Sequence, residues 1–291
     1  YSGTTGGTVT SGIVREGEIG IFNAGSGTVT IANNGIITME KGSTTGIKIT
    51  SNGTVTGGIV NMSSNPGGVG VDYGNAGGNV TSMTINVNGT SQSGIKASAA
   101  IGNNKLSNVI INLNSDSTNG IESSANVDSQ ATISSSGYRS SIVGIKSSAD
   151  VTNRGTITLS SRGSVTGITG ANASNYGGIT VSGYGSNNVG IHGTTSANNY
   201  SGGTVNVTGT SNAAGLLSAG TTSNAGSVAV SGNYSAGLLS TGAASNSGNV
   251  TVTGDYSDGI NSTNNNGSSS SGTINVTGKR VNGIRGKADA N

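Results

Sequence analysis

Several residue types that stabilise or equip most proteins are scarce in this chain of 291 residues. It has no cysteine and no tryptophan, and only one proline and one phenylalanine. Without cysteine, a disulfide framework and thiolate chemistry are excluded. No apolar run approaches the roughly 20 residues of a membrane-spanning helix, and no signal peptide opens the sequence. We therefore interpret the sequence as a mature or excised segment.

Charged residues are also few, at 8% of the chain, and the formal net charge is +2. This balance gives no electrostatic footprint for nucleic acid, so no nucleic-acid partner is expected. Apolar residues make up 31%, below the usual share of a globular domain. Disordered chains usually have high charge and few β-branched residues, whereas Val, Ile and Thr are abundant and regularly placed here. The composition therefore favours strands.

A glycine followed by Ile, Val or Leu recurs along the whole chain, at intervals of 22 to 26 residues with a mean near 24. A fixed period in this range indicates a solenoid, in which each repeat stacks on its neighbours. The repeat glycines are Gly20, Gly46, Gly70, Gly94, Gly120, Gly144, Gly167, Gly190, Gly215, Gly237, Gly259 and Gly283.

A second element, Asn-x-Gly-x-β-x-β with an aliphatic residue at each β, keeps the same phase. It begins at Asn153, Asn175, Asn224 and Asn246, and at Asn199 with two inserted residues. The period-two alternation is typical of strands, and no segment has the 3.6-residue periodicity of a helix. We predict an all-β fold, a right-handed parallel β-helix of about 12 coils of ~24 residues, three strands to a coil. Residues 1–291 are predicted to form a single domain.

The residue after each repeat glycine is predicted to face the interior, and the glycines to permit tight turns with positive φ. The narrow interior favours aliphatic and small side chains and leaves little room for large aromatics. Each repeat asparagine is open to two interpretations, a ladder of amides or the left-handed turn geometry that Asn tolerates. The predicted inward residues are Ile21, Ile47, Val71, Ile95, Ile121, Ile145, Ile168, Ile191, Leu216, Leu238, Ile260 and Ile284.

The next residue of each repeat should point outward, because strand side chains alternate. From Lys48 to Lys146 this outer column alternates in charge. We interpret the alternation as control of register and solubility, with a charged binding stripe as the alternative. The outer column is Phe22, Lys48, Asp72, Lys96, Glu122, Lys146, Thr169, His192, Leu217, Leu239, Asn261 and Arg285.

Three pairs of large side chains are the candidates for a surface contact. Two leucines are neighbours in the outer column, two tyrosines follow the repeat asparagine, and two more stand three residues before a repeat glycine. Each tyrosine pair is predicted to stack. Contact with carbohydrate or protein and plain packing between coils both remain open. The candidates are Leu217, Leu239, Tyr176, Tyr200, Tyr234 and Tyr256.

Catalytic and metal-binding patterns are not found. A catalytic triad needs a histidine as its base. The one histidine here is His192, and it has no acidic neighbour in sequence. The carboxylates are scattered: Glu16 and Glu18 form the nearest cluster, and Asp255 and Asp258 bracket a predicted turn. We predict a non-enzyme with no catalytic, cofactor-binding or metal-binding residues and no cofactor.

The repeats at 144–159, with Gly-Ile and Asn-Arg-Gly-Thr-Ile-Thr-Leu, and at 225–232, Ala-Gly-Ser-Val-Ala-Val-Ser-Gly, resemble the passenger repeats of type V autotransporter adhesins of Gram-negative bacteria. The resemblance covers essentially the whole chain. It implies export, a β-helical stalk and adhesion or aggregation. The implied partners are a host-cell or bacterial surface protein or glycan, or a second copy. Membrane attachment is implied only through a C-terminal barrel that this chain lacks.

The predicted function is therefore a secreted, extracellular rod at the bacterial cell surface, anchored in the outer membrane by its parent protein. It would mediate attachment to host or bacterial cells, or self-association. Two alternatives remain, a polysaccharide-active β-helix enzyme and a self-assembling extracellular filament subunit.

Overall fold

The computed structural model describes residues 1–15, 18–31, 35–40, 44–64, 66–75, 77–137, 140–263 and 267–286, so Glu16 lies outside the described residues. Within these ranges all the regular elements are β-strands. No helix there is long and apolar enough to span a membrane. The chain divides into two compact units, the N-terminal unit Tyr1–Ala149 and the C-terminal unit Asp150–Asn291. The predicted single domain stays a prediction.

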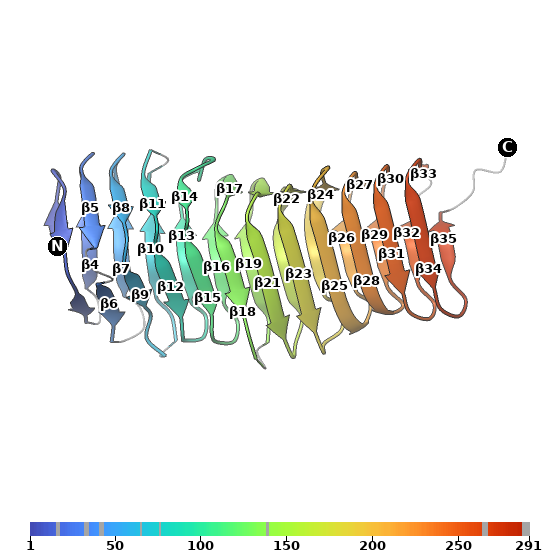
Figure 1. Ribbon diagram of the computed structural model, residues 1–291, viewed down its shortest axis with the longest axis horizontal. Coiled ribbons are helices and arrows are strands. Elements are labelled where there is room, and N and C mark those ends of the chain that lie inside the picture. Colours follow the sequence, from blue (N-terminus) through green and yellow to red (C-terminus); the bar gives the residue numbers. More distant parts are fainter. Residues whose placement is uncertain are drawn as a thin grey trace. The chain divides into compact units, whose positions relative to one another are not determined.

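In the N-terminal unit each coil contributes strands to up to three parallel sheets (Figure 1). The first sheet holds β1 (Ser2–Gly3), β4 (Ile19–Asn23), β7 (Thr45–Ile49), β10 (Val69–Tyr73), β13 (Ser93–Ala97), β16 (Asn119–Ser123) and β19 (Ile142–Ser147). The second holds β2 (Gly7–Val9), β5 (Thr28–Ile31), β8 (Thr54–Thr56), β11 (Asn79–Thr81) and β14 (Leu106–Ser107). The third holds β3 (Gly12–Val14), β6 (Ile36–Met39), β9 (Ile59–Asn61), β12 (Thr84–Val87), β15 (Ile110–Leu113) and β18 (Thr132–Ser135). A bridge joins β17 (Val127–Ser129) to Ile101.

The C-terminal unit repeats this plan with longer strands. Its first sheet holds β22 (Val165–Asn175), β24 (Val189–Asn199), β26 (Ala214–Ser218), β29 (Ala236–Ser240), β32 (Asp258–Ser262) and β35 (Asn282–Arg285). The ends of β22 and β24 pair with β20 (Val151–Asn153) and β27 (Thr221–Asn224), which β30 (Ala244–Asn246) and β33 (Ser268–Ser270) follow. The third sheet holds β21 (Thr156–Ser161), β23 (Gly178–Gly183), β25 (Thr204–Ser211), β28 (Ser227–Asn233), β31 (Asn249–Thr253) and β34 (Thr273–Thr277).

Strand pairing follows the sequence repeat. Val71 pairs in parallel with Ile95 in the N-terminal unit, and Leu216 pairs with Leu238 in the C-terminal unit. Each unit is therefore a parallel β-solenoid, and the predicted all-β class and repeat spacing are confirmed. The right-handed sense stays a prediction.

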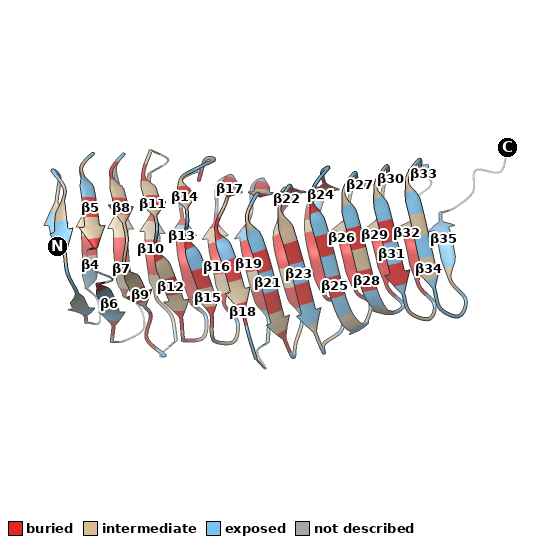
Figure 2. Cartoon of the chain, in the orientation of Figure 1, coloured by how far each residue is buried: buried red, intermediate tan, exposed pale blue. Residues whose placement is uncertain are grey.

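Buried residues alternate with exposed ones along the strands (Figure 2). Eleven of the twelve predicted inward residues have no exposed surface. Ile284 is the exception, because it is 46% exposed. Its strand, β35, pairs with β32 alone among the described strands, so only one side of Ile284 is covered.

One large aromatic side chain lies inside the N-terminal unit, contrary to the expectation that aromatics hardly fit. Tyr73 is fully buried, and its hydroxyl donates to the Gly78 carbonyl over 2.6 Å. The neighbouring coil places the small side chain of Ala97 in register with it, which leaves room for the ring. Burial raises the pKa of Tyr73 to about 12, because the ionised phenolate loses its hydration.

The repeat glycines permit close packing, and the prediction that they adopt positive φ is wrong. A Cβ on Gly237 would lie 2.3 Å from Cγ1 of Val250 and 2.6 Å from the carbonyl oxygen of Gly259. The left-handed turn comes three residues earlier in the repeat. The residues with positive φ at that position are Gly67, Ser91, Ser117 and Ser141 in the N-terminal unit, and Asn187, Asn212, Tyr234, Tyr256 and Arg280 in the C-terminal unit.

Candidate functional site

A ladder of buried asparagine amides runs through the C-terminal unit. Nδ2 of Asn153 donates to Oδ1 of Asn175 over 2.8 Å, and the same bond joins Asn175 to Asn199, Asn199 to Asn224 and Asn224 to Asn246 over 2.8–2.9 Å. Each amide also donates to the backbone carbonyl of a glycine two or four residues later. None of the five has positive φ. Of the two interpretations of these repeat asparagines, the ladder of amides is therefore confirmed and the left-handed turn is wrong.

The N-terminal unit has a second ladder, on the outer face of its third sheet. Asn86 donates to Oδ1 of Asn61 over 2.7 Å, Asn112 donates to Oδ1 of Asn86 over 2.8 Å, and the Ser134 hydroxyl donates to Oδ1 of Asn112. This ladder was not predicted from the sequence, because these asparagines lack the Asn-x-Gly motif. The signal was the alignment of Asn86 and Asn112, each between two aliphatic residues of a strand.

The charged outer column lies on the first sheet of the N-terminal unit in the predicted register, which runs Lys48, Asp72, Lys96, Glu122, Lys146. Nζ of Lys48 lies 3.6 Å from the Asp72 carboxylate, and both side chains are about one-third exposed. Solvent screens such pairs, so each contributes at most about 1 kcal/mol. The column therefore favours one register without dominating stability.

A shallow hollow of about 420 Å³ borders this column. Asp72, Lys96 and Glu122 line it together with the hydroxyl-bearing Ser98 and Ser123. Asp72 and Glu122 lie on strands two apart, which places their Cα atoms about 9–10 Å apart. The Lys96 position stands between them, and the Ser93 hydroxyl donates to Oε2 of Glu122 over 2.6 Å. The hollow can therefore offer both charges and hydroxyls to a polar ligand.

Tyr176 and Tyr200 form the first tyrosine pair of the C-terminal unit. Their ring centroids are 4.3 Å apart and their planes differ by 2°. The guanidinium of Arg154 lies 4.7 Å from the Tyr176 centroid, a cation–π contact. The predicted stacking is confirmed. The rings cover each other's inner faces, while Tyr176 and Tyr200 stay 41% and 39% exposed.

Tyr234 and Tyr256 form the second pair, with centroids 4.9 Å apart and planes 7° apart. Both adopt positive φ, 53° and 57°, which is unusual for bulky side chains. The backbone N–H of Tyr234 donates to the Asp255 carbonyl of the next coil, and that of Tyr256 to the Lys279 carbonyl. Arg280 extends the stack, with its guanidinium 5.5 Å from the Tyr256 ring. The stack of left-handed turns thus aligns the rings.

The two leucines, Leu217 and Leu239, pair in register on β26 and β29, and both are half-buried. The next position in the column is His192, whose Nδ1 lies 3.4 Å from the Thr169 hydroxyl. Burial lowers the pKa of His192. The leucines lie mid-strand, whereas the tyrosine pairs follow β22 and β24 or precede β29 and β32, so the six candidates form three separate contacts.

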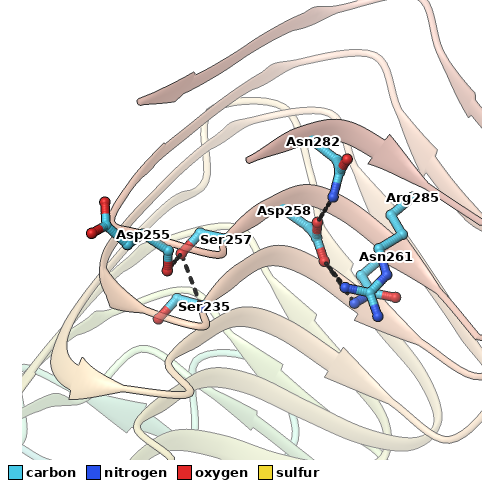
Figure 3. Close-up of polar contacts among 7 residues, drawn as sticks. All are labelled: Ser235, Asp255, Ser257, Asp258, Asn261, Asn282 and Arg285. Carbon is cyan, nitrogen blue, oxygen red and sulfur yellow. Dashed lines mark hydrogen bonds and ion pairs between the residues drawn. The ribbon is translucent and has the colours of Figure 1, made fainter. Parts of the chain in front are cut away.

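Asp258 lies directly after the turn that it and Asp255 were predicted to bracket, and its buried contacts were not predicted from the sequence. It begins β32 and is buried, and its carboxylate accepts from Nδ2 of Asn282 over 2.7 Å and from Nδ2 of Asn261 over 2.8 Å (Figure 3). Arg285 pairs with it at 3.5 Å. Asp255 does remain in the turn, where its carboxylate accepts the Lys279 N–H. A buried carboxylate needs such partners, so Asp258 joins β32 to β35.

In the part of the chain that the structure describes, no three His, Asp or Glu side chains gather where they could hold a metal ion. No protein-family model, curated protein or solved structure matches the chain. The fold class therefore stands on the structure itself.

Proposed function

We propose that this chain is a structural and adhesive β-solenoid of a bacterial cell surface, a passenger segment of a Gram-negative type V autotransporter adhesin. The observation that supports the proposal is the register of the outward side chains, which the charged column of the N-terminal unit illustrates from Lys48 to Lys146. The outward position recurs on every neighbouring strand, and the same sign of charge recurs on every second strand. Weak contacts made at several such positions together give avidity that none has alone.

The same column supports self-association as one form of this function. A second copy that lies antiparallel and is offset by one strand places Lys48 opposite Glu122, and Asp72 opposite Lys96. The arrangement is self-complementary, as a two-fold interface requires. Each exposed ion pair is weak, so association should need several pairs and should weaken in salt.

The test uses one preparation of the full chain for cell binding and for analytical ultracentrifugation. We expect saturable binding to bacterial or host cells, or a concentration-dependent dimer that salt dissociates. An acidic-column variant, Lys48→Glu with Lys96→Glu, and a basic-column variant, Asp72→Lys with Glu122→Lys, should each lose the dimer and regain it when mixed. If the unmodified chain stays monomeric and binds no cell or glycan, the proposed function is wrong.

The hollow beside Asp72 and Glu122 supports the second candidate, a polysaccharide-active enzyme. Inverting glycoside hydrolases use two carboxylates about 6.5–9.5 Å apart, and two strand spacings give the Cα atoms of Asp72 and Glu122 a similar separation. Incubation with a panel of surface polysaccharides should release reducing ends if this candidate holds. Glu122→Gln should then abolish the release. No release from any polymer would remove the enzyme candidate and leave the adhesive proposal intact.

A further inference from the structure

The two tyrosine pairs of the C-terminal unit hold phenol rings in contact at the surface. We infer that Tyr176–Tyr200 and Tyr234–Tyr256 are sites of oxidative cross-linking, where a haem peroxidase with hydrogen peroxide joins each pair as dityrosine. The centroids are 4.3 and 4.9 Å apart. All four residues are 39% to 59% exposed, so a surface oxidant can reach the rings. The inference rests on this stacking and is independent of the proposed adhesive role.

The reaction divides a two-electron oxidation between two phenols. Each phenol gives up one electron and its hydroxyl proton, and the resulting phenoxyl radical carries spin on the ring carbons beside the oxygen. One such carbon from each ring forms a new C–C bond, and the hydrogens they carried move to the oxygens and restore both phenols. One hydrogen peroxide is reduced to two waters for each bond. The product is therefore two hydrogen atoms lighter.

The fold favours coupling within the chain over coupling between chains. Asn175 and Asn199 pair in register, so the residues that follow them, Tyr176 and Tyr200, lie side by side at the ends of neighbouring strands. Partners held together in this way react at a high effective concentration. Tyr184 is 74% exposed but belongs to neither pair. It would have to couple with a second molecule.

A cross-link here would add a covalent bond between the surfaces of neighbouring coils, which now meet there only through non-covalent contacts. The closed loops would run from 176 to 200 and from 234 to 256. A covalent bond that closes a loop restricts the unfolded chain and so favours the folded state. We therefore expect the oxidised chain to unfold at a higher temperature than the untreated chain.

The experiment treats the dilute full chain with a haem peroxidase and hydrogen peroxide, then identifies cross-linked peptides by mass spectrometry. We expect 176–200 and 234–256 cross-links, each two hydrogens lighter, in protein that remains monomeric on a denaturing gel. Tyr200→Phe and Tyr256→Phe keep a ring for stacking but remove a phenol. Each should abolish its own cross-link and leave the other.

Tyr184→Phe is the matched control and should leave both cross-links unchanged. Circular dichroism confirms that each variant keeps its strands, so a lost cross-link reports chemistry and not unfolding. The inference is overturned if both pairs stay uncoupled, whether or not Tyr184 links molecules. It is equally overturned if the two cross-links persist in the Phe variants.

Discussion

The second sheet of the N-terminal unit buries large aliphatic side chains such as Val55, Val80 and Leu106. At the matching place, the C-terminal unit buries Ala173 and Ala197 beside the asparagine ladder. The first arrangement gains stability from apolar area. The second depends on amides that must all be paired, since a buried unpaired amide is costly. One coil plan thus tolerates two kinds of interior, and they should respond differently to substitution.

The largest effect is expected in the middle of the ladder. Asn199→Ala removes the donor to Oδ1 of Asn224 and the acceptor for Asn175, and leaves both buried amides short of a partner. We expect a loss of about 3–5 kcal/mol in the free energy of unfolding, measured by urea denaturation. Asn206→Ala, at an exposed outward position of the same unit, should change it by less than about 0.5 kcal/mol. Equal losses would contradict the ladder's role.

The next effect tests close packing at a repeat glycine. Gly237→Ala places a methyl group 2.3 Å from Val250 and should cost about 2–3 kcal/mol through overpacking. Gly283→Ala is the matched control, because a Cβ there meets nothing within 4 Å. Thermal unfolding followed by circular dichroism separates them. A neutral Gly237→Ala would show that the coil can relax around the methyl group.

The N-terminal unit should show its own pH dependence. Tyr73 has a folded pKa of about 12, above the ordinary value of 10, so its stabilising contribution is complete below pH 10. As pH rises from 10 to 12 the unfolded chain ionises first, and about 2–3 kcal/mol is lost. The denaturation midpoint should fall over this window. In Tyr73→Phe the denaturation midpoint should fall less over this window. The titration of lysines affects both proteins alike.

A smaller gain is expected where the C-terminal unit buries a hydroxyl. Oγ1 of Thr222 has no hydrogen-bond partner among the described residues and lies at a position that neighbouring coils fill with alanine. Thr222→Val keeps the shape and removes the polar atom, so stability should rise by about 1 kcal/mol. Ser245→Val, at an exposed neighbouring position, is the control. A loss of stability in Thr222→Val would reveal a bonded hydroxyl.

The smallest effect belongs to the charged column. Lys96→Glu places three carboxylates on successive strands, with Asp72 and Glu122 on either side. We expect a loss of about 0.5–1 kcal/mol that shrinks in high salt. Lys96→Gln should lose less. A loss independent of salt would point to packing by the lysine stem instead of charge.

Much of the fold followed from the sequence because strand alternation and a fixed period determine which residues share a column. Ile47 and Leu238 face inward for this reason, and the tyrosine pairs stack for it. The positive φ of Tyr234 did not follow, since a bulky residue gives no local sign of it. Gly67, Asn187 and Asn212, at the same place in the repeat and tolerant of that conformation, carried the hint.

The contacts outside the repeat were harder to predict. Asp258 lies where its column neighbour is Ala236, and its burial depends on Asn282 and Asn261 supplying amides from neighbouring positions. Tyr73 is buried because Ala97 is small. Whether such an unusual residue can be buried depends on its neighbours in the adjacent coil, which the pattern of a single strand does not reveal.

The strict register of the C-terminal unit has a genetic consequence. Residues 214–218 and 236–240 have the same sequence, Ala-Gly-Leu-Leu-Ser, and occupy paired positions on neighbouring strands. Recombination between the two DNA segments would remove or duplicate 22 codons, which is one whole coil. The reading frame would be kept, and the amide of Asn199 would still face an asparagine at the matching position of the next coil. Length can therefore vary between lineages in whole-coil steps while the interior of the solenoid stays intact.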